Sequence, residues 1–286
     1  MKKLLTPYLL GLVVLVFVPF GVTAVMAFSE YDLINPPRWI GTGNFAELWG
    51  DDAFHISLMN SLVFAAIAVP LRLAIALALA LLLHRRSVLG GTARTTAALP
   101  AAIPEIAYGL LWLWLFNPWY GPINQFLGGA DGLTVFGRTP PGWLTLPNDA
   151  RAGIIIMSLF TIGEMFLILV AVRRALPRDV YELAEIEDAT GWDIFRRVTL
   201  PMMAPALGLL LVRDTILSLQ LSFTPALVVT NGGPPPYATT YLSLFVYRNA
   251  FEYLRYGYAA AATVVMLLLT VAAVAVQWRL LSSRRR

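Results

Sequence analysis

Two ionisable side chains lie inside long apolar runs of this sequence, where a charge needs a physical reason. Arg72 lies near the middle of the run 61–83, and Glu164 lies near the middle of the run 152–172. At the centre of a bilayer a charged side chain costs roughly 2.5 kcal/mol or more. We therefore expect either an Arg72–Glu164 ion pair between the two runs, or a Glu164 carboxylate that faces a polar cavity. Three further charged residues lie nearer the ends of their runs, where they can reach the interface: Glu105, Arg213 and Asp214.

Polar and aromatic side chains occur in two other apolar runs. A binding site for a polyhydroxylated molecule combines aromatic faces with a few directed polar groups. Together with Glu164, the candidates for such contacts are Tyr108, Trp112, Ser218, Gln220 and Ser222. Trp and Tyr also gather at membrane–water interfaces, and we prefer that interpretation for Trp114 and Trp119.

No combination of residues typical of an enzyme occurs in the sequence. It has no G-x-x-x-x-G-K-[ST] loop, so we do not expect this chain to hydrolyse a nucleotide. It has no G-x-S-x-G or H-E-x-x-H motif either. It contains no cysteine and only two histidines, His55 and His84, in different segments. We therefore predict no catalytic site, no metal site and no cofactor bound by this chain.

The elements that must position the candidate residues are apolar runs of about 20 residues, the length that crosses a bilayer as a helix. The sequence is 58% hydrophobic and 13% charged, against roughly 25% charged in an ordinary soluble domain. In hydrocarbon, every backbone polar group must be satisfied within its segment, which favours helices. We predict an all-α integral membrane protein that forms a single domain over residues 1–286. Its six transmembrane helices lie at about 7–28, 61–83, 97–116, 152–172, 206–229 and 257–278.

The distribution of Lys and Arg predicts the orientation of these helices. Fourteen of the 21 basic residues fall on the side that holds both termini, five on the other side and two inside runs. Because cytoplasmic loops carry an excess of Lys and Arg, we expect a multi-pass protein with both termini in the cytoplasm. This asymmetry accounts for the net charge of +4, so we expect no nucleic-acid partner. The first run has a basic start like a signal peptide, but its length favours a retained helix.

The loop 173–205 is the most charged part of the predicted cytoplasmic side. Two pairs in it are spaced like helix N-terminal caps, Asp179 with Glu182 and Thr190 with Asp193. The apolar side chains that helical spacing would bring to one face are Tyr181 and Ala184 in the first helix and Trp192, Phe195 and Val198 in the second. We predict a short helix–turn–helix unit that docks onto a partner, rather than a solvated linker.

The same loop resembles the cytoplasmic EAA loop of binding-protein-dependent ABC importer permeases. That family's pattern is E-A-A-x-x-D-G-A followed by I-x-L-P. Here it stands as Glu182-Leu183-Ala184-x-x-Glu187-Asp188-Ala189, followed by Val198-Thr199-Leu200-Pro201. Other stretches are similar to permeases of the carbohydrate-uptake type, such as those of maltose and glycerol-3-phosphate importers: "YDLINPPRWIGTGNF" at 31–45, "FNPWYGPIN" at 116–124, "LPRDVYELA" at 176–184, "VVTNGGP" at 228–234 and "YGYAAAA" at 256–262.

The loop departs from the family pattern at three positions. Leu183 replaces the second Ala, Glu187 replaces Asp, and Asp188 replaces the glycine of the turn. Glycine suits such a turn because it adopts positive φ freely, and Asp tolerates positive φ better than most residues. We expect Asp188 to keep the turn, with Gly191 sharing in it, and the partner's pocket to be matched to this loop.

The resemblance implies a type I ABC importer permease fold with cytoplasmic coupling helices. It implies that the loop contacts an ATPase subunit through Tyr181, Glu182, Ala184, Glu187, Asp188, Ala189, Gly191, Leu200 and Pro201. The implied partners are a second homologous permease subunit, two nucleotide-binding subunits that hold ATP and Mg²⁺, and an extracytoplasmic solute-binding protein. The outer loops would contact that last protein.

The function that we expect is to form half of a translocation pathway for a sugar in a bacterial or archaeal cell (inner) membrane. A permease for a phosphorylated polyol or a glycerophosphodiester is an alternative, although the sequence places few cations at mid-membrane. An ATP-independent channel and an intramembrane enzyme are alternatives from other classes. The docking loop argues against the channel, and the missing catalytic motifs argue against the enzyme.

Overall fold

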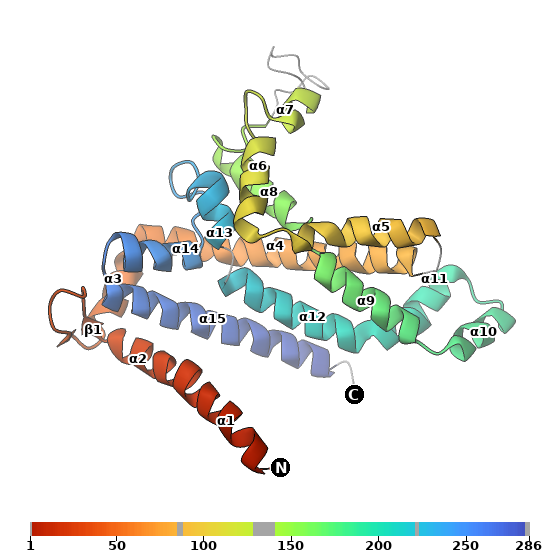
Figure 1. Ribbon diagram of the computed structural model, residues 1–286, viewed down its shortest axis with the longest axis horizontal. Coiled ribbons are helices and arrows are strands. Elements are labelled where there is room, and N and C mark those ends of the chain that lie inside the picture. Colours follow the sequence, from red (N-terminus) through yellow and green to blue (C-terminus); the bar gives the residue numbers. More distant parts are fainter. Residues whose placement is uncertain (1, 85–87, 128–140, 221–222, 284–286) are drawn as a thin grey trace.

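The computed structural model describes residues 2–84, 88–127, 141–220 and 223–283, which are mostly helical (Figure 1). The bundle is formed by α4 (Asp52–Leu83), α5 (Val88–Ala98), α9 (Gly163–Ala175), α12 (Leu200–Gln220) and α15 (Tyr256–Ser283), and its longest helices, α4 and α15, run along the long axis of the molecule. At one end of this bundle lie α10 (Arg178–Ile186) and α11 (Gly191–Ile194), followed by a π-helical turn, η3 (Phe195–Thr199). We call this end the α10 end.

The described residues contain four helices that are long and apolar enough to cross a membrane. They are Thr6–Met26, Asp52–Leu83, Gly191–Gln220 and Tyr256–Ser282. Two bent pairs each add a broken span: Gly90–Ala102 with Glu105–Leu115, at 101°, and Pro147–Ser158 with Gly163–Ala175, at 42°. If each bent pair is one span, the described residues of this all-α membrane fold hold up to six spans.

Besides the run 152–172 with its 42° bend, two of the predicted spans differ from one straight α-helix. The run 97–116 is interrupted by a 3₁₀ turn, η2 (Leu99–Ala102), before α6 (Glu105–Leu115). Pro100 and Pro104 lie at this interruption, and proline lacks the backbone N–H that continues a helix. In the run 206–229, the described residues form α12 as far as Gln220. From Phe223 they form the short α13 (Phe223–Pro225) and the π-helical η4 (Ala226–Thr230).

Helix α4 begins earlier than predicted and forms the centre of the bundle. Asp51 caps its first turn, since the Asp51 carboxylate accepts hydrogen bonds from the N–H groups of Ala53 (2.8 Å) and Phe54 (3.4 Å). Toward the α10 end, the small residues Ala76 and Ala80 let large side chains pack closely against α4. The buried residues of α9 and α12 in this cluster are Met165, Phe166, Leu169, Val170, Met203 and Leu210.

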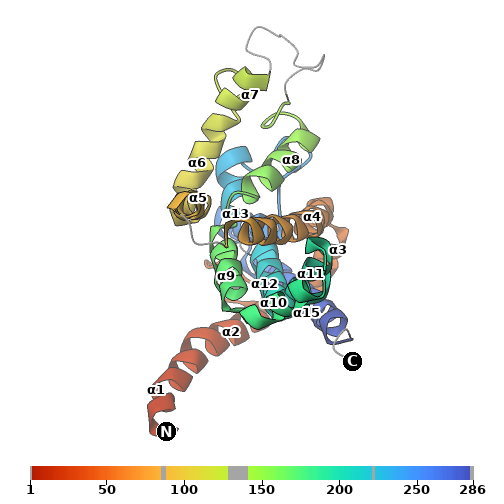
Figure 2. The same ribbon diagram turned by 90° about the vertical axis from the view of Figure 1, so that its right-hand side faces the viewer.

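The other half of α4 packs against helices that leave the bundle sideways. These are α6 and α8 (Pro147–Ser158), which rise on one side of the molecule in both views and carry α7 (Pro122–Leu127) farther from α4 (Figures 1 and 2). Their shared core with α4, η4 and α14 (Leu242–Tyr247) includes Phe64, Tyr108, Trp112, Ile154, Met157, Val229 and Leu244. This core fixes the position of the kinked third span relative to α4.

The end opposite α10 is closed by short elements. The strands β1 (Ser29–Glu30) and β2 (Arg38–Trp39), each two residues long, form an antiparallel hairpin in which Ser29 pairs with Trp39. It lies beside α3 (Gly43–Gly50), and η5 (Arg248–Glu252) precedes α15. The start of α15 passes so close to β1 that a Cβ atom on Gly257 would clash with the carbonyl oxygen of Ser29. We call this end the hairpin end.

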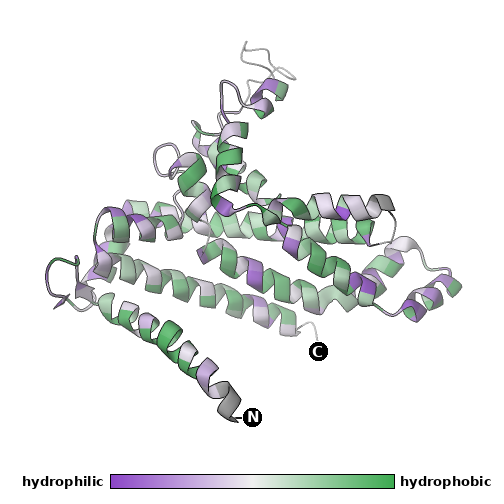
Figure 3. Cartoon of the chain, viewed as in Figure 1, coloured by the Kyte–Doolittle hydropathy of each residue, from purple (hydrophilic) through white to green (hydrophobic). Residues whose placement is uncertain are grey.

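The first helix diverges from the bundle and packs only near its C-terminal end. It comprises α1 (Lys2–Leu12), the π-helix η1 (Val13–Phe17) and α2 (Val18–Met26), and none of the apolar window in Thr6–Met26 is buried. Figure 3 shows the long helices coloured mostly as hydrophobic, and hydrophilic residues gathered on α10 and at the hairpin end. This pattern fits helices surrounded by hydrocarbon between two polar ends.

Candidate functional site

The predicted helix–turn–helix unit is present between α9 and α12. Helix α10 starts directly after Pro177, which occupies the N-cap with φ −59° and ψ 134° and provides no side-chain cap. The predicted capping box of Asp179 with Glu182 is therefore wrong, because the helix begins one residue before Asp179. The second predicted cap is confirmed: Thr190 Oγ1 accepts from the Asp193 N–H (3.2 Å) and donates to Asp193 Oδ2 (2.6 Å).

Asp188 forms the turn between α10 and α11. Its φ is +54°, in the left-handed region predicted for this glycine position. The Asp188 N–H donates to Glu185 O (3.1 Å), and the Ala189 N–H donates to Ala184 O (3.0 Å). These two bonds form the Schellman motif that satisfies carbonyls at a helix end. Gly191 is the first residue of α11 and lacks positive φ, so the prediction that it shares the turn is wrong.

Tyr181 ties α10 to two other segments. Its hydroxyl lies 3.0 Å from Thr199 Oγ1, immediately before α12. The Arg173 guanidinium, near the end of α9, lies over the Tyr181 ring at 4.2 Å from its centroid. A cation over an aromatic face is attractive. The first turns of α10 are therefore fastened to both spans that flank the loop.

Of the apolar side chains predicted to form the docking face of this loop, only Trp192 is exposed, and Phe195 and Val198 are partly buried. Leu183, Ile186 and Trp192 are 60%, 79% and 67% exposed, whereas Tyr181 and Ala184 are partly buried against the bundle. The remaining residues of the predicted ATPase contact divide in the same way: Ala189 and Leu200 are partly buried, and Glu182, Glu187, Asp188, Gly191 and Pro201 are exposed.

A charged pocket of about 640 Å³ lies beside α10. It is lined by His84, Arg173, Arg174, Leu176, Arg178, Tyr181, Glu182 and Glu185. Arg178, Glu182 and Glu185 make no ion pair or side-chain hydrogen bond with any described residue. The loop therefore combines protruding apolar groups with unpaired charges of both signs.

Arg72 pairs with Asp214, not with Glu164. An Arg72 guanidinium nitrogen and Asp214 Oδ2 are 3.1 Å apart, and each side chain is 10% exposed. Arg72 also donates to Ser218 Oγ, whose hydroxyl donates to Asp214 O at 2.7 Å. The predicted Arg72–Glu164 pair is therefore wrong, because the carboxylate beside Arg72 is that of Asp214 on α12. The expectation that Asp214 reaches the interface is wrong for the same reason.

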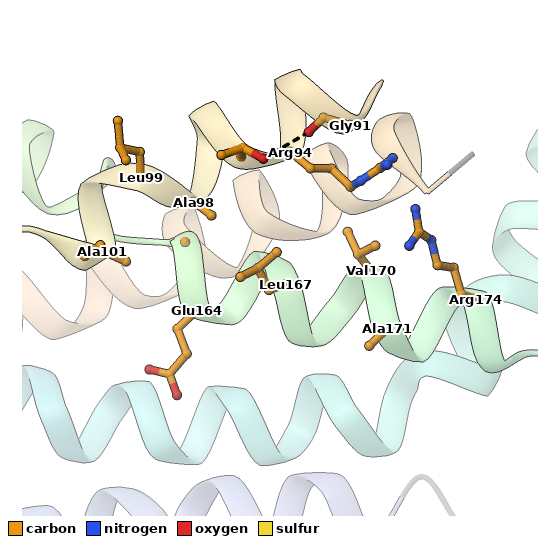
Figure 4. A pocket seen from close by; sticks show the side chains of 13 residues that line it. Gly91, Arg94, Ala98, Leu99, Ala101, Glu164, Leu167, Val170, Ala171 and Arg174 are labelled. Carbon is orange, nitrogen blue, oxygen red and sulfur yellow. Dashed lines mark hydrogen bonds between the residues drawn. The ribbon is translucent and has the colours of Figure 1, made fainter. Parts of the chain in front are cut away.

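Glu164 instead pairs with Arg213, the residue before Asp214. Glu164 Oε2 and Arg213 Nη2 are 2.6 Å apart, and these side chains are 60% and 41% exposed. Successive helical residues point about 100° apart, so α12 directs Asp214 toward α4 and Arg213 toward α9. Glu164 lies on the side of α9 that faces α12 (Figure 4).

A third polar contact joins α12 to α15 at the same level. Gln277 Nε2 donates to Thr215 Oγ1 at 2.7 Å. Residues 213–218 thus connect α12 to three neighbouring helices, α4, α9 and α15. We call this set of contacts the α12 polar belt.

The predicted pathway residues are placed in three different environments. Tyr108 and Trp112 are 5% and 6% exposed, and the Tyr108 hydroxyl donates to Met157 O at 2.6 Å. Contrary to expectation, both belong to the core in this conformation and cannot contact a solute. Ser218 is buried in the α12 polar belt. Ser222 lies outside the described residues.

Gln220, Arg213 and Glu164 share one exposed face. Gln220 is partly exposed and follows Arg213 by seven residues, about two helical turns. Leu209, one turn before Arg213, is 71% exposed. The sequence analysis did not predict this position of Arg213. Two adjacent charges in an apolar run, Arg213 and Asp214, were the available indication, but both were expected to reach the membrane interface.

Comparison with known proteins places the chain in a family. Residues 71–286 match the family described as binding-protein-dependent transport system inner membrane component. The chain is 32% identical over 270 residues to the probable ABC transporter permease protein YesP of Bacillus subtilis (strain 168), covering 93% of this chain and 84% of YesP. It is 29% identical over 286 residues to the sulfoquinovosyl glycerol transport system permease protein SmoG of Agrobacterium fabrum (strain C58), covering 98% and 90%.

Solved structures show the same fold. Two structures of a bacterial ABC transporter that imports the acidic polysaccharide alginate match with TM-scores of 0.82 and 0.80, at 22% and 21% identity. The matches cover 99% and 96% of this chain and 94% and 91% of the alginate transporter chain. The fold is thus that of a type I ABC importer permease. With most of its length matched, the chain belongs to the family of binding-protein-dependent transport system inner membrane components, the permease subunits of ABC importers.

Proposed function

We propose that this chain forms half of the translocation pathway of an ATP-driven importer for a sugar or related polyol. Membership of the permease family supports the transport role. Two similar proteins support the substrate class by their names, which refer to sulfoquinovosyl glycerol and to alginate. Catalysis of ATP hydrolysis, with its Mg²⁺, belongs in this proposal to two separate nucleotide-binding subunits.

The observation that carries the coupling part of the proposal is the exposed face of the α10–α11 loop. Leu183, Ile186 and Trp192 protrude from a unit that Tyr181 and the Schellman turn hold in one shape. Exposed apolar groups rimmed by charges are typical of protein interfaces. The proposed occupant is a cleft of the ATPase subunit, and the rigid attachment lets movement of that subunit reach α9 and α12.

The proposed orientation places the α10 end and both termini in the cytoplasm. The hairpin end then faces the extracytoplasmic solute-binding protein. A periplasmic protein bound to an alginate pentasaccharide is part of one of the matching structures, which supports this partner. The second homologous permease completes the pathway.

The pathway itself is proposed to run along the exposed face of α9 and α12. Glu164 and Arg213 lie within apolar spans yet keep 60% and 41% of their side chains exposed. Such charges are costly in lipid, so this face is proposed to meet water and the second permease. As a neutral pair with donors and acceptors, the two side chains suit solute hydroxyls.

The test is reconstitution of the chain with its partner subunits and receptor in liposomes. Solute-dependent ATP hydrolysis accompanied by uptake is the expected result. The solute is first found by a thermal-shift screen of the receptor against a panel of sugars and polyols. Purification without any ATPase subunit, or uptake that continues without ATP, would contradict the proposal.

A further inference from the structure

A groove of about 850 Å³ lies between α5 and α9 on the surface of the bundle (Figure 4). Its walls are mostly small or apolar, including Ala98 on α5 and Val170 and Ala171 on α9, and Thr95 and Glu164 also line it. Leu99 and Leu167 are 60% and 47% exposed at its edge. At one end the helices touch, since a Cβ atom on Gly163 would lie 2.7 Å from Ala98 O.

The other end of the groove, nearest α10, carries two arginines. Arg94 Nη1 donates to Leu83 O at 2.8 Å, and Arg174 Nε donates to His84 O at 2.9 Å. Both residues therefore bind carbonyls at the end of α4, which fixes their guanidinium groups beside the groove. The Nη nitrogens of Arg174 make no hydrogen bond to any described residue, and a guanidinium presents five N–H donors in all.

The groove is arranged along one face of α9. Leu167, Ala171 and Arg174 recur at helical spacing. Because a helix rises 1.5 Å per residue, the mostly apolar wall between Leu167 and Arg174 is about 10 Å long. A ligand that fits has an anionic head and an apolar tail. Planar guanidinium groups bind phosphate through paired hydrogen bonds.

We propose that this groove binds an anionic phospholipid. Its phosphate lies between Arg94 and Arg174, and one acyl chain follows Leu167 and Val170 toward Leu99. Basic pockets between membrane helices on the cytoplasmic side are a recurrent site for acidic lipid head groups. The inference rests on the proposed function only for the assignment of the α10 end to the cytoplasm.

Lipid retention by the purified complex tests the proposal. The complex is extracted in mild detergent from membranes that contain phosphatidylglycerol and cardiolipin, and bound lipid is measured by native mass spectrometry. The wild type is expected to retain one anionic phospholipid per copy of this chain. The variant R94Q/R174Q is expected to retain far less lipid, because its affinity for the lipid should fall by roughly fivefold for each arginine that is removed. Equal retention by both would overturn the proposal.

Two further variants separate lipid binding from damage to the end of α4. Leu167→Trp fills the groove while both arginines keep their carbonyl contacts, and it is expected to lower lipid retention. R178Q removes an arginine at the same end but outside this groove, and it is expected to retain lipid like the wild type. Loss of lipid from R178Q with retention in Leu167→Trp would show a diffuse basic surface and refute the groove.

A protein occupant is the competing possibility. Because the chain has no cysteine, Leu167→Cys provides a single reactive site in this subunit. Efficient cross-linking of Leu167→Cys to the second permease in the membrane, with no bound lipid in the wild type, would overturn the lipid assignment. Bound lipid is measured without uptake or ATP hydrolysis, so this result and a failure of the proposed transport function are distinguishable.

Discussion

Arg72 on α4 and Asp214 on α12 face each other in the interior of the bundle, with their charged atoms 3.1 Å apart and each side chain 10% exposed. Ser218 completes the contact from the next turn of α12. Removing one member of a buried ion pair leaves the other charge without compensation, which typically costs about 3–5 kcal/mol. The pair therefore holds α12 against α4 at the level of the α12 polar belt.

The first prediction concerns this pair. D214N and R72Q, made separately, are each expected to lower the thermal unfolding midpoint of the purified complex and its yield in the membrane. R72L/D214L is expected to be less damaging than either, because it leaves no unpaired charge. Unfolding midpoints of all three against the wild type are the measurement. A double variant as unstable as the sum of both single variants would contradict this account.

The identity of these ion partners shows where sequence reasoning reaches its limit. Charges in apolar runs indicate that Arg72 and Glu164 need compensation, and both are compensated. Which carboxylate meets which guanidinium depends on the rotation of α12, which sends the adjacent Arg213 and Asp214 to different neighbours. That rotation is decided by packing across the whole bundle and leaves no local signal.

In the membrane spans and in the α10–α11 loop, too, local residue types predict some features and packing decides the others. Hydropathy located the apolar runs, and the match to the family's loop pattern located the turn at Asp188, because both depend on local residue type. Pro100 and Pro104 mark the interruption before α6 in the sequence, but the angle of 101° also depends on how the core around Tyr108 and Trp112 packs against α4 and α8. The same packing buries these two side chains, which aromatic composition alone made candidates for solute contact.

The second prediction concerns the docking face of α10. Ile186→Asp places a charge on a side chain that is 79% exposed, so folding and membrane insertion should be unchanged. Association with the ATPase subunit, measured by co-purification, is expected to be lost together with uptake. Ile34→Asp is the matched control for ATPase association alone, because Ile34 is 82% exposed at the hairpin end, away from α10. Normal ATPase association of Ile186→Asp would argue against this docking face.

A third prediction concerns Glu182 in the charged pocket beside α10. Glu182→Lys, or deletion of residues 182–189, is expected to leave membrane insertion intact while separating ATP hydrolysis from uptake. The reason is that Glu182 is exposed and has no partner among the described residues, so its contact is expected with the ATPase subunit. Uptake at the wild-type rate in proteoliposomes made with these variants would remove the coupling role.

The fourth prediction uses the backbone of the turn. Asp188 has φ +54°, so Asp188→Gly is expected to keep both ATP hydrolysis and uptake. Asp188→Val forces a β-branched residue into the left-handed region, at a cost of about 1–2 kcal/mol or more. Uptake is expected to fall more than ATP hydrolysis, since the turn sets the angle between α10 and α11. Equal activities of the Gly and Val variants would show that the turn does not matter.

The last prediction concerns the exposed face of α9 and α12. If Glu164 and Arg213 border a water-containing pathway, cysteines placed near them should react with a membrane-impermeant thiol reagent. Leu209→Cys and Gln220→Cys are suitable because both side chains lie on the Arg213 face of α12 and the chain has no cysteine of its own. Thiols ionise poorly in hydrocarbon, so only positions that meet water react rapidly.

Leu268→Cys on α15, 62% exposed in the isolated chain, is the control expected to face lipid and stay unlabelled. Labelling of Leu268→Cys but not of Gln220→Cys would place the pathway on the other side of the bundle, and Glu164 would then be a structural partner of Arg213 alone.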